Sequence, residues 1–325
     1  MIRFWPLLAF LAVLAVACTE GNAPAPVATS ASGEEEQAEG LVRATATPAP
    51  GRASVPRLVP EPGRLDVYFF DVSLGDAIYI RTPANLDVVI DGGESDDELS
   101  AFLDTLGETE IDVLIASHPH ADHIGGLARV IRERKVGAVW TNGQPYTTTL
   151  FKDLEEAIAS AGVPKNAGAP GTTFMLGEVK FSILAPSRIR SNVNDNSLVV
   201  RMDCGTSSFL FTGDAETSAE NDMIGSRQEL DVDVLKLGHH GSRTSSSRQM
   251  ILASTPRLAV YSALEGNEYG HPHTETLERL RAENVATFGT RDAGGTVVVS
   301  IACDDQFSVT PKLGGFATIA TGPKP

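Results

Sequence analysis

Three histidines and an aspartate fall within six consecutive positions, at His118, His120, Asp122 and His123. They follow the apolar run 111–117, which predicts a buried β-strand. Four polar groups on so short a piece of backbone converge only around a positive charge, because burying them unpaired is costly. Imidazole and carboxylate suit zinc, and sites richer in oxygen admit manganese. The stretch therefore predicts a metal site in a loop at the end of a strand.

Strand and helix patterns alternate through the rest of the chain. Runs rich in β-branched or aromatic residues predict strands at 65–72, 77–82, 86–93, 136–140, 179–186, 197–204, 208–214, 231–238, 258–263 and 296–303. Apolar residues at helical spacing predict helices at 99–106, 127–131, 149–161, 245–253 and 274–283. Ser95 and Glu98 form a predicted capping box before the first helix. This alternation indicates one layered α/β domain with helices outside sheets.

The N-terminus has the layout of a signal peptide. Arg3 precedes the apolar stretch 4–17, which at about 14 residues is short for a membrane span. The sequence AVAC that ends at Cys18 resembles a bacterial lipobox, whose cysteine is lipidated, with alanine where leucine is usual. We expect a signal peptide over 1–18 and an exported protein, lipid-anchored to the membrane and facing the periplasm or cell exterior. A plain secreted form and an uncleaved anchor are the alternatives.

Three further segments complete the expected organisation. Residues 19–62 are rich in Ala, Pro, Thr, Gly and Glu without apolar periodicity, so we expect a disordered tether. The folded domain is expected over 63–310 and a C-terminal tail over 311–325. Cys204 and Cys303 lie in separate strand patterns, where they either pair in an exported protein or serve as small core residues.

The charge balance limits the choice of partners. The net charge of −16 argues against a broad basic surface for nucleic acid. It leaves room for a local phosphate site, because bound cations would dominate the field there.

The pattern H-x-H-x-D-H at 118–123 resembles the metallo-β-lactamase-fold hydrolases. In that family the first two histidines bind one metal and the Asp-His pair binds a second. A bridging aspartate follows a later strand, and a histidine follows the next. Here FLFTGDA supplies Asp214, and VLKLGHHGS supplies His239 or His240, of which the position at the strand end favours His239. The resemblance implies an αββα sandwich of two mixed sheets with outer helices, holding two divalent metal ions, Zn or Mn.

Other segments narrow the resemblance. FFDVSLGDAIYI, VVIDGG, NDNSLVVRM, LKLGHHGSRTSS and YGHPH are similar to the extracytoplasmic hydrolase domain of ComEC competence proteins, over roughly 64–303. No 18-residue apolar run follows the signal, so a stand-alone relative of that domain is expected.

The chain departs from the wider family at one metal ligand. Many members have a third histidine for the first metal, some twenty residues before the bridging aspartate. Here that region contains Asn194, Asp195 and Asn196, as in the ComEC-like branch. The first site is therefore expected to be open or oxygen-rich, with weaker occupancy or a harder ion, and with Asp195 as substitute ligand. The two asparagines are candidates for supporting a ligand or contacting substrate. The missing turn argues against glyoxalase and β-lactamase activity.

Further polar residues have a functional and a structural interpretation. Asp91 either orients the metal loop or caps a turn, and Asp76 is expected to organise its loop or support a ligand. His271 or His273 either donates a proton to the leaving group or packs at a helix entry. A last pair, Ser242 and Arg243, either contacts a phosphate or consists of a capping serine and a solvated arginine.

Two metals favour hydrolysis of a phosphate ester by a metal-activated water. We expect a phosphodiesterase or nuclease in which Asp122 and His240 also belong to the catalytic group. Its partners would be a phosphodiester such as DNA and, through the lipid anchor, a membrane, without an obligate protein partner. Hydrolysis of another small ester, such as a phosphocholine or a lactone, and a non-catalytic surface binding module are the alternatives. A basic rim of Arg188, Arg190, Arg243 and Arg248 would favour a polyanion, and a closed apolar pocket a small ester.

Overall fold

The computed structural model describes residues 63–311, except 74, 294 and 304–306. The expected signal peptide, the tether and residues 312–325 of the expected tail lie outside the described residues. Within the described ranges, no helix combines the length and apolar character needed to cross a membrane.

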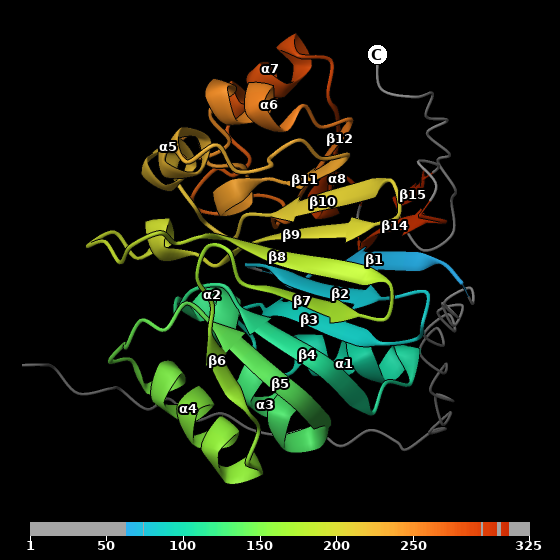
Figure 1. The fold of residues 1–325 in the computed structure, drawn as a ribbon, viewed down its shortest axis with the longest axis vertical. Coiled ribbons are helices and arrows are strands. Elements are labelled where there is room, and N and C mark those ends of the chain that lie inside the picture. The colour runs from blue at the N-terminus through green and yellow to red at the C-terminus, as the bar shows by residue number, and fades with distance from the viewer. Residues whose placement is uncertain (1–62, 74, 294, 304–306, 312–325) are drawn as a thin grey trace, which may run out of the picture. The chain divides into compact units, whose positions relative to one another are not determined.

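The strands form two mixed sheets (Figure 1). The first sheet has eight strands in the order β15 (Phe307–Pro311), β14 (Val297–Ile301), β1 (Leu65–Phe69), β2 (Ala77–Arg81), β3 (Asp87–Gly92), β4 (Glu110–Ala116), β5 (Lys135–Thr141) and β6 (Lys165–Ala167). The second has seven in the order β13 (Ala286–Gly289), β12 (Leu258–Tyr261), β11 (Val234–Lys236), β10 (Ser207–Phe211), β9 (Val199–Cys204), β8 (Val179–Ala185) and β7 (Thr173–Leu176). Strands β3 to β6 run parallel, as do β10 to β13.

Helices cover the outer face of each sheet, on opposite sides in Figure 1. The first sheet carries α1 (Glu98–Leu106), α3 (Leu127–Glu133) and α4 (Thr149–Ala161). The second carries α5 (Thr217–Gly225), α6 (Arg248–Ser254) and α7 (Thr274–Ala282). Short helices are α2 (Ala121–Ile124), α8 (Thr290–Ala293) and the 3₁₀ turns Asn194–Asn196 and Gly238–Gly241. The expected αββα sandwich is confirmed.

Alternation along each strand builds three apolar layers. In β1, Leu65, Val67 and Phe69 face the core between the sheets, whereas Tyr68 faces the helices on the other side. The central core joins both sheets, as in the contact of Phe69 with Phe211 at 6.4 Å between ring centroids. The two sheets are therefore held face to face by their buried inner surfaces.

Helices α1, α3, α4, α6 and α7 and the inner strands lie where the sequence predicts them, whereas α2, α8 and the edge strands were not predicted. The four strands that the pattern missed, β6, β7, β13 and β15, are the outermost strands of the two sheets. Edge strands are short and half-exposed, which weakens the apolar pattern on which prediction depends. The capping box is also wrong: the N-cap of α1 is Asp97, and the Glu98 carboxylate accepts a hydrogen bond from Ser73.

Cys204 and Cys303 form a disulfide. Cys204 ends β9 in the second sheet, and Cys303 follows β14 in the first. The bond therefore links the two sheets, which decides the alternative that the sequence left open in favour of pairing.

Candidate metal centre

The loop after β4 presents the expected histidines at the edge of the sandwich. Parallel strands end at the same edge of a sheet, so the segments after β3 and β4 meet there, and those after β10 to β12 join them from the second sheet. Gly75 (φ 92°) packs against the Asp122 carbonyl, where a Cβ would lie 1.6 Å from the oxygen. Only glycine fits this approach, which lets the Asp76 N–H donate to the same carbonyl at 3.1 Å.

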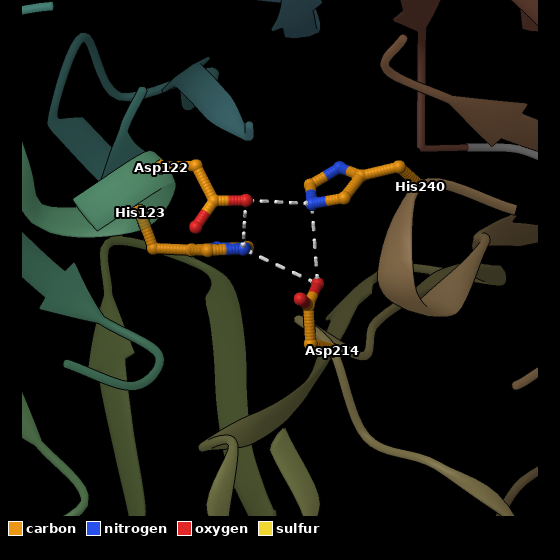
Figure 2. Close-up of side chains that lie close together, drawn as sticks. All are labelled: Asp122, His123, Asp214 and His240. Atoms are coloured by element: carbon orange, nitrogen blue, oxygen red, sulfur yellow. Dashed lines mark ion pairs between the residues drawn. The ribbon is translucent and has the colours of Figure 1, made fainter. Parts of the chain in front are cut away.

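Four side chains converge to form what we call the closed group: Asp122, His123, Asp214 and His240 (Figure 2). His123 Nε2 lies 3.2 Å from Asp214 Oδ1 and 3.7 Å from Asp122 Oδ2. His240 Nε2 lies 3.3 Å from Asp122 Oδ2 and 3.5 Å from Asp214 Oδ1. Ligands held about 2.1 Å from a tetrahedral ion lie about 3.4 Å apart, which these separations match.

A second cluster, the open group, consists of His118, His120 and Asp214. His118 Nε2 lies 3.0 Å from His120 Nδ1 and 3.8 Å from Asp214 Oδ2. Asp214 belongs to both groups and offers one carboxylate oxygen to each. The two groups therefore have the arrangement needed for two metals that share one carboxylate.

Carboxylates support both histidines of the closed group. Asp91 Oδ2 lies 2.8 Å from His123 Nδ1, and Asp76 Oδ1 lies 3.3 Å from His240 Nδ1. Asp76 is in turn paired with the fully buried Lys236 at 2.7 Å. Asp91 fixes the proton on Nδ1 of His123 and leaves Nε2 with a lone pair for a metal, and Asp76 faces Nδ1 of His240 as an ion-pair partner. This is the metal-loop role considered for Asp91, and it gives Asp76 a ligand-supporting role.

The open group has weaker support. His118 Nδ1 contacts two hydroxyls, Ser117 Oγ at 3.1 Å and Ser197 Oγ at 3.3 Å. His120 is half-buried and borders the pocket described below. A hydroxyl polarises imidazole less than a carboxylate does, so this group is the weaker of the two as a metal site.

The charges of the closed group depend on one another. Burial alone would lower the pKa values of His123 and His240. Asp214 and its neighbouring carboxylates outweigh this effect: they hold the pKa of His123 well above its usual range and raise that of His240 to about 9. Burial opposes ionisation of Asp214, but the His123 and His240 imidazoles hold its pKa well below its usual range. The pocket thus keeps its carboxylates ionised and attracts either protons or metal cations.

Unsatisfied polar atoms indicate where cations belong. His123 Nε2, Asp214 Oδ1 and His240 Nε2 are buried and have no hydrogen-bond partner among the described residues. Buried polar atoms are nearly always paired, and here the three point at one another. A divalent ion would satisfy all three, so the residues present fit a zinc or manganese ion.

The structure places the two adjacent histidines differently. His240 is buried in the closed group, whereas His239 is half-exposed, with Nδ1 3.2 Å from Glu216 Oε1 and Nε2 3.8 Å from Asp214 Oδ2, the oxygen that faces the open group. Both residues have left-handed backbone conformations, at φ 50° and 54°. This turn brings both imidazoles toward Asp214, His240 to Oδ1 at 3.5 Å and His239 to Oδ2 at 3.8 Å. Such strain in two consecutive residues is typical of a functional site.

The expected substitute ligand is not in the open group. Asp195 is buried, and its Oδ1 accepts a hydrogen bond from the Ala219 N–H at the start of α5. Asn196 is also buried and holds Arg190 backbone atoms through its side chain. Asn194 borders the metal pocket instead, and its Oδ1 has no hydrogen-bond partner among the described residues. Of the three, only Asn194 is placed to face a metal or substrate.

The remaining predicted residues divide between the pocket and its surroundings. His271 borders the pocket, with its ring 5.3 Å from that of His239. His273 lies behind it, where Nδ1 accepts from the Arg243 N–H. Ser242 is buried against Thr244, and neither Ser242 nor Arg243 borders the pocket. The packing interpretation therefore fits His273 and Ser242 better than the catalytic one.

The metal pocket has a volume of about 320 Å³. His120, Asp122, Asp214 and His240 form its floor, and the segment 262–271 forms a wall. An adjoining groove of about 710 Å³ contains Arg188 and Arg190, both paired with Asp222. The other two arginines of the expected rim, Arg243 and Arg248, border neither cavity, so none of the four borders the metal pocket itself.

Sequence reasoning missed two functional positions. Lys236 is a lysine within an apolar strand, and that exception to the pattern could have predicted a buried partner such as Asp76. Glu216, two residues after the bridging aspartate, carried no signal, because its contact with His239 comes from a distant strand end.

Comparison with known proteins agrees with this geometry. The family model described as Metallo-beta-lactamase superfamily matches residues 71–263. The chain is 27% identical over 252 residues to ComE operon protein 3 of Bacillus subtilis (strain 168), covering 71% of this chain and 32% of that protein. It is 31% identical over 245 residues to Competence protein ComA of Neisseria gonorrhoeae, covering 74% of this chain and 33% of that protein. The chain thus spans about a third of the length of these curated relatives.

Among solved structures, the chain is similar to the metallo-beta-lactamase fold protein YhfI from Bacillus subtilis. The TM-score is 0.47 at 12% identity, covering 73% of this chain and 99% of that chain.

Proposed function

The chain belongs to the metallo-β-lactamase superfamily, and on that premise we propose that it is a metal-dependent phosphodiesterase or nuclease acting outside the cytoplasmic membrane. The observation that carries this proposal is the sharing of Asp214 between two ligand groups at the floor of one pocket. A pair of metals bridged in this way suits displacement at phosphorus, since both the attacking and the leaving oxygen need stabilisation.

In this proposal the closed group holds one divalent ion and the open group a second. Bound ions would lower the pKa of a water molecule and neutralise charge on the phosphate oxygens. The chain's own residues keep the ligands in the required protonation state. Asp91 retains the Nδ1 proton of His123, Asp76 faces Nδ1 of His240 as an ion-pair partner, and Lys236 keeps Asp76 ionised.

Two neighbouring residues are placed to act on the substrate. Burial, together with the nearby imidazoles, lowers the pKa of His271 to about 4, so it is neutral at pH 7 and presents a hydrogen-bonding ring to the pocket. Asn194 borders the same pocket with an unpaired Oδ1, and its Nδ2 lies 3.4 Å from His239 Nδ1. Neither residue needs to change protonation state to orient a phosphoester.

The resemblance to the ComEC hydrolase domain supports DNA as a substrate, and the relative from Neisseria gonorrhoeae is a protein named for competence. A small ester remains the second candidate, because part of the pocket wall is apolar, with Leu264 and Tyr269.

Hydrolysis assays test the proposed function. The purified full-length protein, with Mn²⁺ or Zn²⁺, is expected to cleave bis(p-nitrophenyl) phosphate and linear DNA, and His240→Ala is expected to lose both activities. Glu178→Gln, in the exposed β7–β8 turn, serves as the matched control. Cleavage of the small ester without DNA would restrict the function to small phosphodiesters. Metal binding without turnover of either would contradict the proposal and favour another ester or the binding module.

Export with a lipid anchor is proposed with the function. The lipobox-like sequence ending at Cys18 supports it, as does the disulfide, because disulfides persist in oxidising compartments. Metabolic labelling with radioactive palmitate should label the wild type in the membrane fraction, whereas Cys18→Ser should be unlabelled. Labelling of both proteins alike would contradict the anchor.

A further inference from the structure

One wall of the metal pocket carries apolar surface that the fold does not use. Five large apolar side chains are exposed among the described residues, and two of them, Tyr269 (59% exposed) and Leu264 (41%), border this pocket. Exposed single apolar residues are common, but two on the wall of a site built from charged groups indicate a ligand that is both anionic and apolar.

Two aromatic rings on this wall stack on each other, and the inner one lies near the closed group. Tyr269 lies over His271 with ring centroids 5.8 Å apart and an angle of 27° between the planes. His271 in turn lies 6.2 Å from His240, a member of the closed group. We call Tyr269 and His271 the aromatic platform. The platform begins beside the metal site, and its outer ring, that of Tyr269, is open to solvent.

The loop that presents the platform is held in one conformation. Asn267 donates from Nδ2 to the carbonyls of Leu264 and His271, at 2.8 and 2.6 Å. Its Oδ1 accepts from the His271 N–H at 2.9 Å. A preorganised aromatic surface loses little entropy on binding, which is the property expected of a recognition surface rather than of a loose loop.

An unsatisfied polar group lies at the base of the same wall. Ser262 is 2% exposed and borders the pocket, and its Oγ has no hydrogen-bond partner among the described residues. A buried hydroxyl without a partner is unusual, and it would be satisfied by a ligand that carries a donor or acceptor beside an apolar plane.

We propose that Tyr269 and His271, with Ser262 beside them, form a nucleobase subsite, which makes nucleotide phosphoesters the substrates of this centre. The inference rests on the proposed function, because the metal groups are taken to hold the phosphate. A nucleotide is a phosphate joined through a sugar to a planar heterocycle with polar edges. Those three properties match the metal groups, the aromatic stack and the unpaired hydroxyl.

The test compares ligands that share a phosphate and differ in the base. Binding of thymidine 5′- and 3′-monophosphate and of methyl phosphate to the Mn²⁺-loaded full-length protein is measured by calorimetry. We expect at least one thymidine nucleotide to bind roughly tenfold more tightly than methyl phosphate, the scale of one stacked base. Tyr269→Ala should raise the Kd of that nucleotide roughly tenfold and leave methyl phosphate unchanged.

Three variants separate stacking from other effects. Tyr269→Phe keeps the ring and should bind like the wild type. Ser262→Ala removes one neutral hydrogen bond and should weaken nucleotide binding about threefold to tenfold. Leu252→Ala removes an exposed apolar side chain outside the pocket and should change nothing.

The outcomes distinguish the subsite from the proposed function. Methyl phosphate that binds as tightly as both nucleotides, or Tyr269→Ala that weakens all ligands equally, overturns the subsite alone. Hydrolysis of methyl p-nitrophenyl phosphate, which has no base, tests the phosphodiesterase alone. If no phosphate binds at all, the subsite fails together with the phosphate site on which it rests.

Discussion

The closed and open groups share Asp214 and differ in the side chains that contact their histidines from behind. The closed group has four ligands, and carboxylates stand behind both of its histidines. The open group has three ligands, and hydroxyls stand behind His118. The groups behind the ligands therefore make the closed group the stronger candidate metal site and the open group the weaker, more accessible one, although both use imidazole ligands. We infer that the closed group anchors a metal and the open group faces the substrate.

Removing the shared ligand should have the largest effect. Asp214→Ala is expected to lose metal from both groups and to lower phosphodiester hydrolysis roughly a thousandfold or more, because metals supply several kcal/mol of charge stabilisation. Metal content by mass spectrometry and kcat/KM check this together. Glu178→Gln is the control. One tightly bound metal remaining in Asp214→Ala would show that the groups do not depend on a common carboxylate.

The pH dependence of stability should distinguish the metal-free from the metal-loaded protein. His240 has a pKa of about 9 when folded and about 6.5 when unfolded, so its contribution is complete below pH 6.5 and lost as the pH rises through 9. We expect the unfolding free energy of the metal-free protein to fall by about 3 kcal/mol over that interval. A bound metal replaces the protons and should remove this decline.

Urea unfolding at pH 6 and pH 9.5, with and without Zn²⁺, measures this difference. Asp76→Asn should reduce the decline, because the Asp76 carboxylate is one of the groups that raise the pKa of His240. Equal pH dependence with and without metal would mean that the cation binds elsewhere.

Removing the charge of the carboxylate behind His240 should weaken metal binding in the closed group alone. Asp76→Asn is expected to lower the affinity of the tighter metal about 10- to 100-fold, as for other carboxylates behind metal-binding histidines. Competition with a coloured chelator gives both affinities. A loss of the weaker metal instead would contradict the assignment of His240 to the closed group.

The smallest effect is expected in the open group. Ser197→Ala removes the hydroxyl that lies 3.3 Å from His118 Nδ1. This hydroxyl also accepts a hydrogen bond from the Asp214 N–H. A neutral hydrogen bond is worth about 1 kcal/mol, so the weaker metal should lose roughly fivefold in affinity. The same chelator competition applies, and an effect as large as that of Asp76→Asn would remove the distinction between the two kinds of support.

The sequence predicted one side of the centre better than the other. The loop after β4 contains four potential ligands within six positions, so their spacing alone indicates a metal site: His118, His120, Asp122 and His123. The second sheet contributes residues from separate strand ends, and there the sequence does not decide between neighbours. At the adjacent histidines, two left-handed residues determine that His240 rather than His239 joins the closed group, and nothing in the pattern specifies them.

The other sequence predictions succeeded or failed for the same physical reason, the difference between local patterns and contacts across the fold. Inner strands have strong alternation and were predicted, whereas the four edge strands were missed, and the three of them whose burial is described, β6, β7 and β13, are half-exposed. Asp195 carried the right chemistry for a ligand, but the α5 backbone holds its carboxylate away from the site. Local patterns therefore predict elements and ligand types, and contacts between distant segments determine which side chains meet.

Stepwise metal loading tests the two-group account most directly. Metal-free protein would be titrated with Mn²⁺ while bound metal and hydrolysis of bis(p-nitrophenyl) phosphate are followed together. We expect a first, tight equivalent of metal without activity and a second, weaker equivalent with which activity appears, and His120→Ala should lose only the second. Full activity at one equivalent, or a tight first metal that disappears in His120→Ala, would contradict it.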